Sequence, residues 1–438
     1  MYLLLSTAGL AAAVTSAVVF LGYLMKQGRR QTETSTKTFG VVHLKHDVYF
    51  GSFRFFYRPA YFLSEAIEAA CDAMVAFKIR SNNIIILRGL AGRDAFYSKV
   101  YPQLMRDTAT LMTTSMGEHG TVDLFDALDQ IIFALAVRLG SCVEFSEDSQ
   151  KIKKLRQIFK DLEAGSSPSA ILFPSLPTPS RISRTLAGIK MYNMINEVIQ
   201  ARKRHDRRED DTLQALIDGN YSPTDITRFI ATLIFAAISN TGNTLGWVLV
   251  HLEKHPDVKD QVIQELQKLS LNPEIYMEDF EGATPSIEPC INETLRLVLN
   301  GTFVRKNIGD ELIVDGVRIQ HGTYLMYPTT DLHFHPRFYP NPYQFDPMRF
   351  DPQVVEERKE AGLTFLAWGA ARHICTGKRS AILLMKMVLV QLATYDFTLV
   401  DSKGSPLENI PPPAYDTLFK VCQPGRKDRV FLKYQKRR

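Results

Sequence analysis

The stretch Trp368-Gly-Ala-Ala-Arg-His-Ile-Cys-Thr-Gly377 stands directly before an apolar segment, Lys378 to Tyr395, whose apolar residues recur at helical spacing. This segment predicts a core helix. Cys375 therefore lies at a helix start, where free amides and the helix dipole favour a negatively charged sulfur. Gly369 and Gly377 allow a sharp bend or a close approach to a flat cofactor. By spacing alone, a metal-ligating thiolate and an inert buried cysteine are equally good interpretations.

A pair of opposite charges stands upstream in Glu293-Thr-Leu-Arg296, and its i, i+3 spacing puts both side chains on one face of a helix. The flanking residues are apolar, which favours a half-buried ion pair. Such a pair needs a further partner to offset its desolvation. Arg349, in Phe345-Asp-Pro-Met-Arg-Phe350, is the candidate partner.

A long and largely apolar segment, Asp225 to Lys254, precedes both features. Ser222 suits the cap of a helix and Pro223 suits its first turn. A helix that is apolar on all sides is expected in the core.

These features occur in the order and rough spacing of the cytochrome P-450 superfamily: a long central helix, the E-x-x-R helix, the F-x-P-x-R-F segment and the cysteine loop. The chain resembles this family strongly over about residues 214–397 and more weakly from the N-terminal region onward, with a general similarity to fungal microsomal members. The resemblance implies a mainly α fold with a small β region. It also implies one haem-thiolate catalytic domain over residues 38–438.

The resemblance implies haem b as the cofactor, with Cys375 as the axial ligand of its iron, where thiolate donation favours O–O cleavage. Two basic residues are candidates to bind the haem propionates: His373 and Arg305. Trp368 and Gly369 open the cysteine loop and are further candidates to contact the haem. A structural triad would hold the core on the cysteine-loop side: Glu293, Arg296 and Arg349.

The resemblance also implies a partner, an NADPH-dependent cytochrome P-450 reductase. Basic residues near the cysteine would suit an acidic docking surface: Arg372, Lys378, Arg379 and Lys386. An ordinary solvated role for these charges is an equally good interpretation.

The central helix departs from the family pattern. Where members usually have an acid and a threonine that relay protons, this chain has Ser239, Asn240 and Thr241, and none supplies a carboxyl proton. Asparagine here, with tryptophan opening the cysteine loop, resembles the branch of prostacyclin synthase and the sterol 7-alpha- and 12-alpha-hydroxylases. Some members of that branch rearrange peroxides and others hydroxylate, so Asn240 does not decide the reaction. Thr241 is a candidate anchor for an ordered water.

A second departure is an absence. Family members usually carry a W-x-x-x-R helix in the region that corresponds to residues 97–101, but the only tryptophans here are Trp247 and Trp368. This region normally covers the haem, so a truncated and catalytically inactive family member is one alternative interpretation.

The N-terminus predicts a membrane anchor over residues 1–30. Tyr2 to Met25 contains no charged residue, which is enough to cross a bilayer as one helix, and Lys26, Arg29 and Arg30 follow. This charge pattern favours a cytosolic catalytic domain. A cleaved signal peptide fits less well, because no basic region precedes the apolar run.

Composition argues against a nucleic-acid-binding protein, and the cysteine pattern indicates a reducing compartment. The net charge is only +5, from 52 basic and 47 acidic residues, and it is dispersed. Five cysteines without a CxxC pair exclude a disulfide framework.

Coarse patterns predict helices at Ala60 to Phe77 and Val122 to Leu139, and a strand at Asn83 to Leu87. The charged run from Arg202 to Asp211 is interpreted as a solvated helix end or loop.

The resulting hypothesis is a single-pass monooxygenase of the endoplasmic reticulum membrane that oxidises a lipophilic small molecule such as a sterol, a terpenoid or another secondary metabolite. The alternative enzyme is a haem-thiolate isomerase or dehydratase of peroxides. Dependence on NADPH and dioxygen separates the two.

Overall fold

A computed structural model describes residues 37–38, 41–43, 74–79, 82–86, 104–164, 178–270, 280, 282–357, 364–370, 373–414 and 420–437. The chain divides into two compact units, residues 1–96 with 218–220 and residues 97–217 with 221–438. The predicted anchor over residues 1–30 lies outside the described residues.

The described residues of the first unit include a four-stranded sheet with the strand order β1-β2-β3-β4, built from Lys37–Thr38, Val41–His43, Met74–Ile79 and Asn82–Ile86. The predicted strand at Asn83 to Leu87 is confirmed as β4. The predicted helix at Ala60 to Phe77 is wrong at its end, because β3 begins at Met74 and pairs antiparallel with β4. The rest of that prediction lies outside the described residues.

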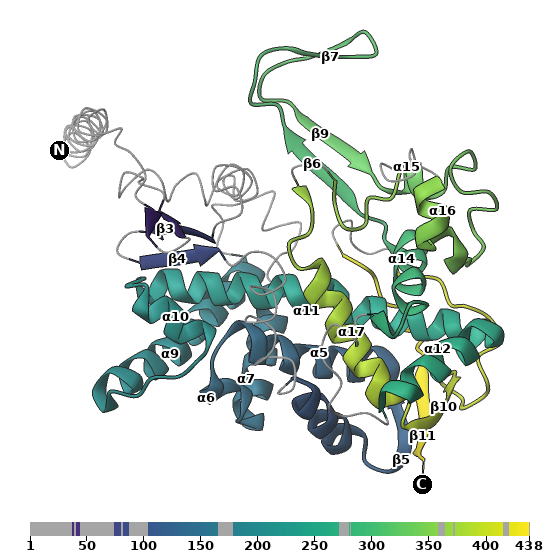
Figure 1. Cartoon of the computed structure of the whole chain (residues 1–438), viewed down its shortest axis with the longest axis horizontal. Helices are drawn as coiled ribbons and strands as arrows, with labels where there is room; N and C mark the ends of the chain where they lie inside the picture. The colour runs from purple at the N-terminus through teal and green to yellow at the C-terminus, as the bar shows by residue number, and fades with distance from the viewer. Residues whose placement is uncertain are drawn as a thin grey trace. The chain divides into compact units, whose positions relative to one another are not determined.

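The second unit is mainly helical, as predicted (Figure 1). Its helices are α5 (Leu124–Gly140), α6 (Val143–Ser146), α7 (Ser149–Ala164), α9 (Pro179–His205), α10 (Thr212–Asp218), α11 (Pro223–Lys254), α12 (Pro256–Ser270), α14 (Ile287–Val298), α15 (Thr330–His333), η1 (Pro347–Phe350), α16 (Pro352–Glu357) and α17 (Lys378–Leu392). Its strands are β5 (His119–Asp123), β6 (Thr302–Lys306), β7 (Leu312–Val314), β8 (Val317–Ile319), β9 (Tyr324–Pro328), β10 (Tyr395–Val400) and β11 (Phe431–Lys436). They form a sheet β10-β11-β5 and two hairpins, β6-β9 and β7-β8.

Helix α11 is the long core helix that the sequence predicts. Ser222 caps it, with its Oγ accepting a hydrogen bond from the Asp225 amide at 3.1 Å. It packs along α5, and a Cβ at Gly246 would lie only 2.6 Å from the Phe125 ring. Among the described residues it is the one helix long and apolar enough to cross a membrane, but 59% of its most apolar window is buried inside the protein. This burial is typical of a core helix.

Two hydrophobic clusters meet along α11. Its first turns pack with α5, α7 and α9, and its later turns pack with α12, α14 and α17. The crossing of α11 and α17 is visible at the centre of Figure 1. The core therefore connects α17, the helix that follows Cys375, with α11, the helix that carries residues 239–241.

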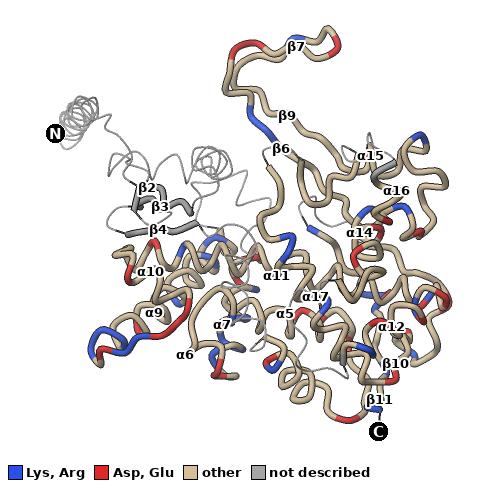
Figure 2. Tube along the Cα trace, viewed as in Figure 1, with Lys and Arg blue, Asp and Glu red and all other residues tan. Residues whose placement is uncertain are grey.

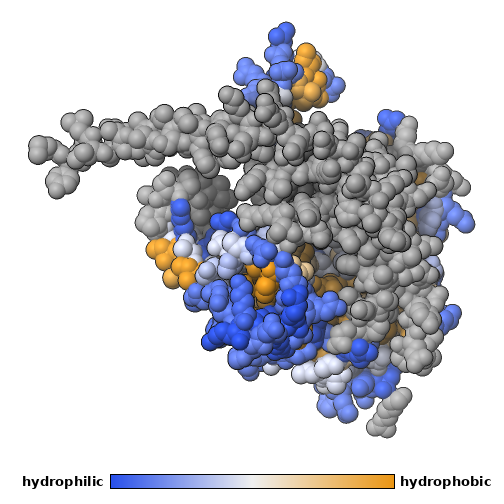
Figure 3. Space-filling model, turned by 60° about the vertical axis from the view of Figure 1, so that its left-hand side comes forward, coloured by the Kyte–Doolittle hydropathy of each residue, from blue (hydrophilic) through white to orange (hydrophobic). Residues whose placement is uncertain are grey.

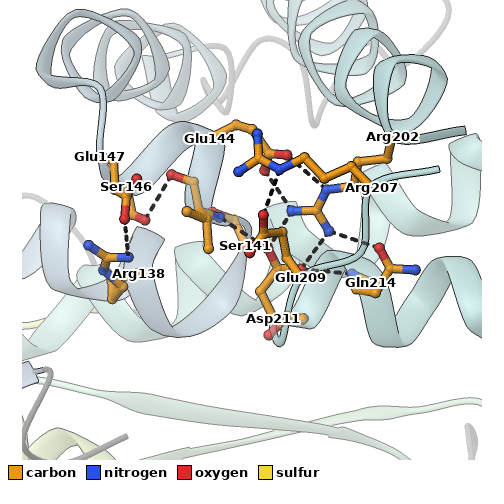
Figure 4. A network of polar contacts seen from close by, with 12 residues as sticks. Arg138, Ser141, Glu144, Ser146, Glu147, Arg202, Arg207, Glu209, Asp211 and Gln214 are labelled. Carbon is orange, nitrogen blue, oxygen red and sulfur yellow. Dashed lines mark hydrogen bonds and ion pairs between the residues drawn. The ribbon is translucent and has the colours of Figure 1, made fainter. Parts of the chain in front are cut away.

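The charged run at the end of α9 is not only a solvated helix end. Arg202 is 3% exposed and forms two hydrogen bonds to the Glu144 carboxylate, at 2.6 and 2.9 Å, and two to Asp211, at 2.5 and 2.9 Å (Figure 4). It also donates to Gln214 at 3.2 Å. The solvated interpretation is wrong for Arg202 and Asp211, because both side chains are buried and paired with each other. The following basic residues are exposed at the end of α9 (Figure 2).

The β7–β8 hairpin carries exposed apolar side chains. The exposed fraction is 60% for Ile313 and 63% for Val317, and Figure 3 shows the hairpin projecting at the top. Exposed apolar surface of this kind can be covered by another chain or segment. The described residues do not cover it.

Candidate functional site

The centre of the site is a buried ion pair on α14. Glu293 and Arg296 are both fully buried, and the guanidinium donates to the carboxylate through Nε and Nη2, each at 2.7 Å. The spacing of three residues brings them together on one helix face. This bidentate geometry is the strongest form of such a pair.

Arg296 also binds the chain that follows the β6–β9 hairpin. Its Nη1 donates to the carbonyl oxygens of His333 and Pro342 at 2.7 and 2.6 Å, and its Nη2 donates to that of Gln344 at 3.3 Å. Each donor of the guanidinium is therefore used. A segment that is poor in secondary structure is held against α14 in this way.

Arg349, on η1, completes the cluster. Its Nε lies 3.5 Å from Glu293 Oε1, its Nη2 donates to the Asn341 carbonyl at 3.3 Å, and the side chain is 6% exposed. The Asp346 amide donates to the same carboxylate at 3.0 Å. The structure thus brings together the three residues of the predicted triad, although they come from two distant segments.

Two opposing effects act on the carboxyl group of Glu293. Burial raises its pKa, whereas the hydrogen bond and the charge of Arg296, with the charge of Arg349, oppose this rise. The pKa is raised on balance, but two guanidinium groups and a backbone amide face the carboxylate and make the rise smaller than burial alone would cause. The cluster therefore depends on all of its members.

The cysteine loop is closed by its own backbone. The Cys375 amide donates to the Trp368 carbonyl at 2.6 Å, and the His373 amide donates to the Ala370 carbonyl at 3.0 Å. Gly369 has a φ of +78°, and a Cβ on it would lie 2.1 Å from the His373 carbonyl oxygen. Both the backbone angle and the close approach therefore require glycine here.

We expect Gly369→Ala to destabilise the protein by about 2–4 kcal/mol, because the strained φ alone costs about 1–3 kcal/mol and the loop must also move. Chemical denaturation measures this loss. Gly404→Ala is the matched control, since Gly404 has a similar φ of +81° but open space around its Cβ position. Equal losses for the two variants would show that the loop does not need the close approach at residue 369.

Two residues that the sequence did not point out connect the cysteine loop to the ion-pair cluster. The Trp368 indole donates to Asn292 Oδ1 at 2.8 Å, and Asn292 is the neighbour of Glu293 on α14. The Leu366 amide donates to His333 Nε2 at 3.1 Å, while the carbonyl of His333 accepts from Arg296. In the sequence, the only indication of this connection is Asn292, a polar residue within the apolar face of α14.

The Cys375 side chain is exposed, unlike the other described cysteines, Cys142, Cys290 and Cys422. Burial raises the pKa of Cys290 to about 12, and it also raises that of Cys142. Cys375 lies three residues before the start of α17, and Gly377, the N-cap of this helix, offers no side-chain cap. The thiol therefore lies close to a helix start and is open to solvent or a ligand.

The other predicted site residues are distributed as follows. His373 is exposed beside Cys375, whereas Arg305 is exposed on β6 and donates to the Val304 carbonyl at 2.9 Å. Thr241 is buried, and the Asn240 amide oxygen accepts from the Val421 amide at 2.8 Å. The side chain of Ser239 lies outside the described residues.

The basic residues near the cysteine do not all face solvent. Lys378 forms an ion pair with Glu288 at 2.9 Å. Lys386 is 4% exposed, so its predicted role at a docking surface is wrong: it lies on the core side of α17. Arg372 lies outside the described residues.

Two buried histidines make acid sensitivity a property of this region. Burial lowers the pKa of His333 from the usual 6.5 to about 4, and that of His251 to about 3. His251 stacks on Phe345 with ring centroids 4.7 Å apart, and neither of its ring nitrogens has a hydrogen-bond partner among the described residues. Both rings are therefore held neutral.

We expect the contribution of these histidines to the free energy of unfolding to be fully present above pH 6.5 and to be lost as the pH falls toward 4. In this range the histidines of the unfolded chain are protonated, whereas those of the folded protein stay neutral, so acid favours the unfolded state. Each histidine adds up to about 1.4 kcal/mol per pH unit to the slope. Urea titrations between pH 7 and 4.5 measure it. His333→Gln keeps an acceptor for the Leu366 amide and His251→Phe keeps the stack, so each variant should flatten the slope. An unchanged slope in both would contradict this assignment.

Comparison with known proteins assigns the class. A family model described as cytochrome P-450 matches residues 42–417, which is most of the chain. The chain therefore belongs to the cytochrome P-450 family.

Individual relatives are similar at a moderate level. A cytochrome P-450 monooxygenase of Aspergillus aculeatus, AacuE, is 28% identical over 308 residues, covering 66% of this chain and 61% of the relative. Lanosterol 14-alpha demethylase of Cunninghamella elegans is 26% identical over 348 residues, covering 72% of this chain and 66% of the relative. The obtusifoliol 14-alpha demethylase of Sorghum bicolor is 26% identical over 336 residues, with 74% and 65% covered. The chain spans less than two thirds of the length of these relatives.

The cysteine loop suits the haem that the family implies. An exposed thiol at a helix start is a suitable donor for an iron, and a loop with a glycine at positive φ lets a flat ring approach. Ile374, which is 59% exposed next to Cys375, offers an apolar surface, and the exposed His373 offers a donor. The residue types on the exposed side of the loop thus match a flat, mainly apolar ligand with an acidic edge.

Proposed function

We propose that this protein is a haem-dependent monooxygenase that oxidises a lipophilic small molecule, with Cys375 as the proximal ligand of the haem iron. The single observation that carries the proposal is the exposed thiol of Cys375 in a loop tied to the buried Glu293–Arg296–Arg349 cluster. A solvent-exposed cysteine needs no such rigid support unless its position matters.

The residues around the cysteine loop have separate roles in this proposal. Haem b, when bound, supplies the redox-active iron for oxygen chemistry. Cys375 would hold that iron, while His373 and Arg305 would bind the propionates. Gly369 and Trp368 fix the path of the loop, and the triad Glu293, Arg296 and Arg349 fixes the core to which the loop is attached.

The distal side is assigned to Ser239, Asn240 and Thr241 on α11. None of them is an acid, so a proton would have to come through a hydroxyl group or a water rather than from a carboxyl group. Thr241 is the best candidate to hold such a water, because its side chain is buried. This assignment favours a weak or indirect proton supply.

The proposed setting is the endoplasmic reticulum membrane. Residues 1–30 would be a single-pass anchor, residues 38–438 the cytosolic catalytic domain, and an NADPH-dependent cytochrome P-450 reductase the electron donor. The names of the relatives, which include a sterol demethylase and fungal monooxygenases, support a sterol, a terpenoid or another secondary metabolite as the substrate.

A second candidate reaction is the isomerisation or dehydration of a peroxide, which needs neither dioxygen nor a reductase. The lack of an acid at residues 239–241 favours it. In this reaction the peroxide already carries the oxygen atoms, so no proton relay to dioxygen is required.

Oxygen-18 labelling distinguishes the two. The full chain, with reductase and NADPH under labelled dioxygen, is given a panel of sterols and terpenoids, and separately a fatty-acid hydroperoxide without reductase. We expect one labelled oxygen atom in a product of the panel, only when reductase and NADPH are present. Product from the hydroperoxide alone, with none from the panel, would replace the monooxygenase by the isomerase. The control is Cys375→Ala, which should be inactive in both assays.

A further inference from the structure

Three polar side chains lie on one face of α11 in its second half. Asn240, Asn243 and Trp247 are spaced at i, i+3 and i+7, which places them in one row along the helix. The surrounding part of α11 is mainly apolar and packs into the core. A row of amide and indole groups in such a place needs partners.

The partners come from one short segment near the C-terminal end of the described chain. The Val421 amide donates to Asn240 Oδ1 at 2.8 Å, and Asn243 Nδ2 donates to the Val421 carbonyl, also at 2.8 Å. The Trp247 indole donates to the Cys422 carbonyl at 2.7 Å. Three polar backbone groups of two consecutive residues, Val421 and Cys422, are therefore satisfied by side chains of one helix.

The burial of this segment makes these hydrogen bonds important. Val421 is fully buried and Cys422 is 2% exposed, so water cannot replace a lost partner easily. The direction of each bond is fixed by the backbone, since an amide N–H can only donate and a carbonyl can only accept. Asn240 must act as an acceptor and Asn243 as a donor.

The same segment is paired on its other side. The Ala414 amide donates to the Gln423 carbonyl at 2.8 Å, and Pro413 forms a β-bridge with Pro424. Further along α11, Lys254 Nζ donates to the carbonyl oxygens of Leu407 and Glu408 at 3.0 and 2.7 Å. The position of residues 420–424 relative to α11 therefore also sets the position of residues 413–414.

We propose that Asn240, Asn243 and Trp247 form a clasp that fixes residues 420–423 along α11, and that Asn240 is a positioning residue of this clasp rather than a proton relay. The amide oxygen of Asn240 is occupied by Val421, and its amide nitrogen is not an acid. The clasp lies on α11 at the level of residues 239–241. It therefore determines which backbone segment lies next to the residues assigned to the distal side. This last step rests on the function proposed above, whereas the clasp itself does not.

Paired aspartate substitutions test the clasp. Asn240→Asp keeps an acceptor for the Val421 amide, whereas Asn243→Asp removes the donor to the Val421 carbonyl and puts a carboxylate against it. Both add the same charge at half-buried positions of one helix, so their difference reports the direction of the bonds. Asn240→Leu removes the acceptor. Asn193→Asp, on the exposed face of α9, is the control for the added charge.

The readout is hydrogen exchange of the backbone amides of residues 420–423 in the full-length protein, with global stability measured in parallel. We expect Asn240→Leu and Asn243→Asp to speed exchange about tenfold or more, as the loss of one buried hydrogen bond implies. Asn240→Asp and Asn193→Asp should keep the protection. Loss of protection in Asn240→Asp as large as in Asn240→Leu, or none in Asn243→Asp, would overturn the clasp.

The reduced carbon monoxide spectrum of each variant separates this proposal from the proposed function. A chain without haem that still shows the exchange pattern would keep the clasp and lose the monooxygenase. A chain with a thiolate-type spectrum but without the exchange pattern would do the reverse. For the role of Asn240, the pH dependence of product formation by Asn240→Leu decides: loss of a positioning residue should lower product formation by the same factor at every pH, whereas loss of a proton relay would change the shape of the profile.

Discussion

Replacing Glu293 with alanine is expected to lower the free energy of unfolding by about 3–5 kcal/mol, the usual cost of removing one partner from a buried ion pair. The change leaves Arg296 fully buried and Arg349 nearly so, with no carboxylate between them. It also removes the acceptor of the Asp346 amide. Urea denaturation of the purified chain measures the effect, and haem content should fall with it because the cysteine loop is attached to the same helix.

Glu288→Ala is the matched control for this prediction. Glu288 lies on the same helix, and its ion pair with Lys378 is exposed to solvent. Exposed pairs contribute at most about 1 kcal/mol, so the control should be nearly neutral. If Glu293→Ala costs no more than Glu288→Ala, the cluster does not stabilise the site.

Cys375→Ala is expected to abolish thiolate ligation completely while leaving the fold almost unchanged. The side chain is exposed, so its removal should alter the unfolding free energy of the haem-free protein by less than about 0.5 kcal/mol. The ligand is lost altogether, and the low-spin thiolate signal of the ferric protein in electron paramagnetic resonance should disappear.

Cys290→Ala provides the opposite pattern. Cys290 is buried on α14, so this variant should lose about 1 kcal/mol of stability or more and keep the thiolate signal. The two variants together separate ligation from packing. Retention of the signal in Cys375→Ala would remove Cys375 as the ligand.

Local sequence patterns predicted the parts of the site that depend on short-range geometry. The spacing of Glu293 and Arg296 on one helix face, the glycine at position 369 and the cap at Ser222 each follow from rules that act within a few residues. The mainly α fold and the central helix α11 were predictable for the same reason.

Other features depend on contacts between distant segments and could not be predicted in this way. The partner of Asn240 lies 181 residues further along the chain, and Trp368 reaches back 76 residues to Asn292. Arg202 belongs to a run that looks solvated by composition, yet it is buried between Glu144 and Asp211. Similarly, the pairing of β3 with β4 overrides the helical pattern that ends at Phe77.

The central claim, that Cys375 holds a haem through its thiolate, is tested most directly by the reduced carbon monoxide difference spectrum of the purified chain as it stands. Because this chain lacks a W-x-x-x-R segment, the same spectrum also tests whether haem is retained without it. We expect a thiolate-type spectrum with close to one haem per chain. A spectrum typical of a histidine or other neutral ligand, or the absence of bound haem, would contradict the account.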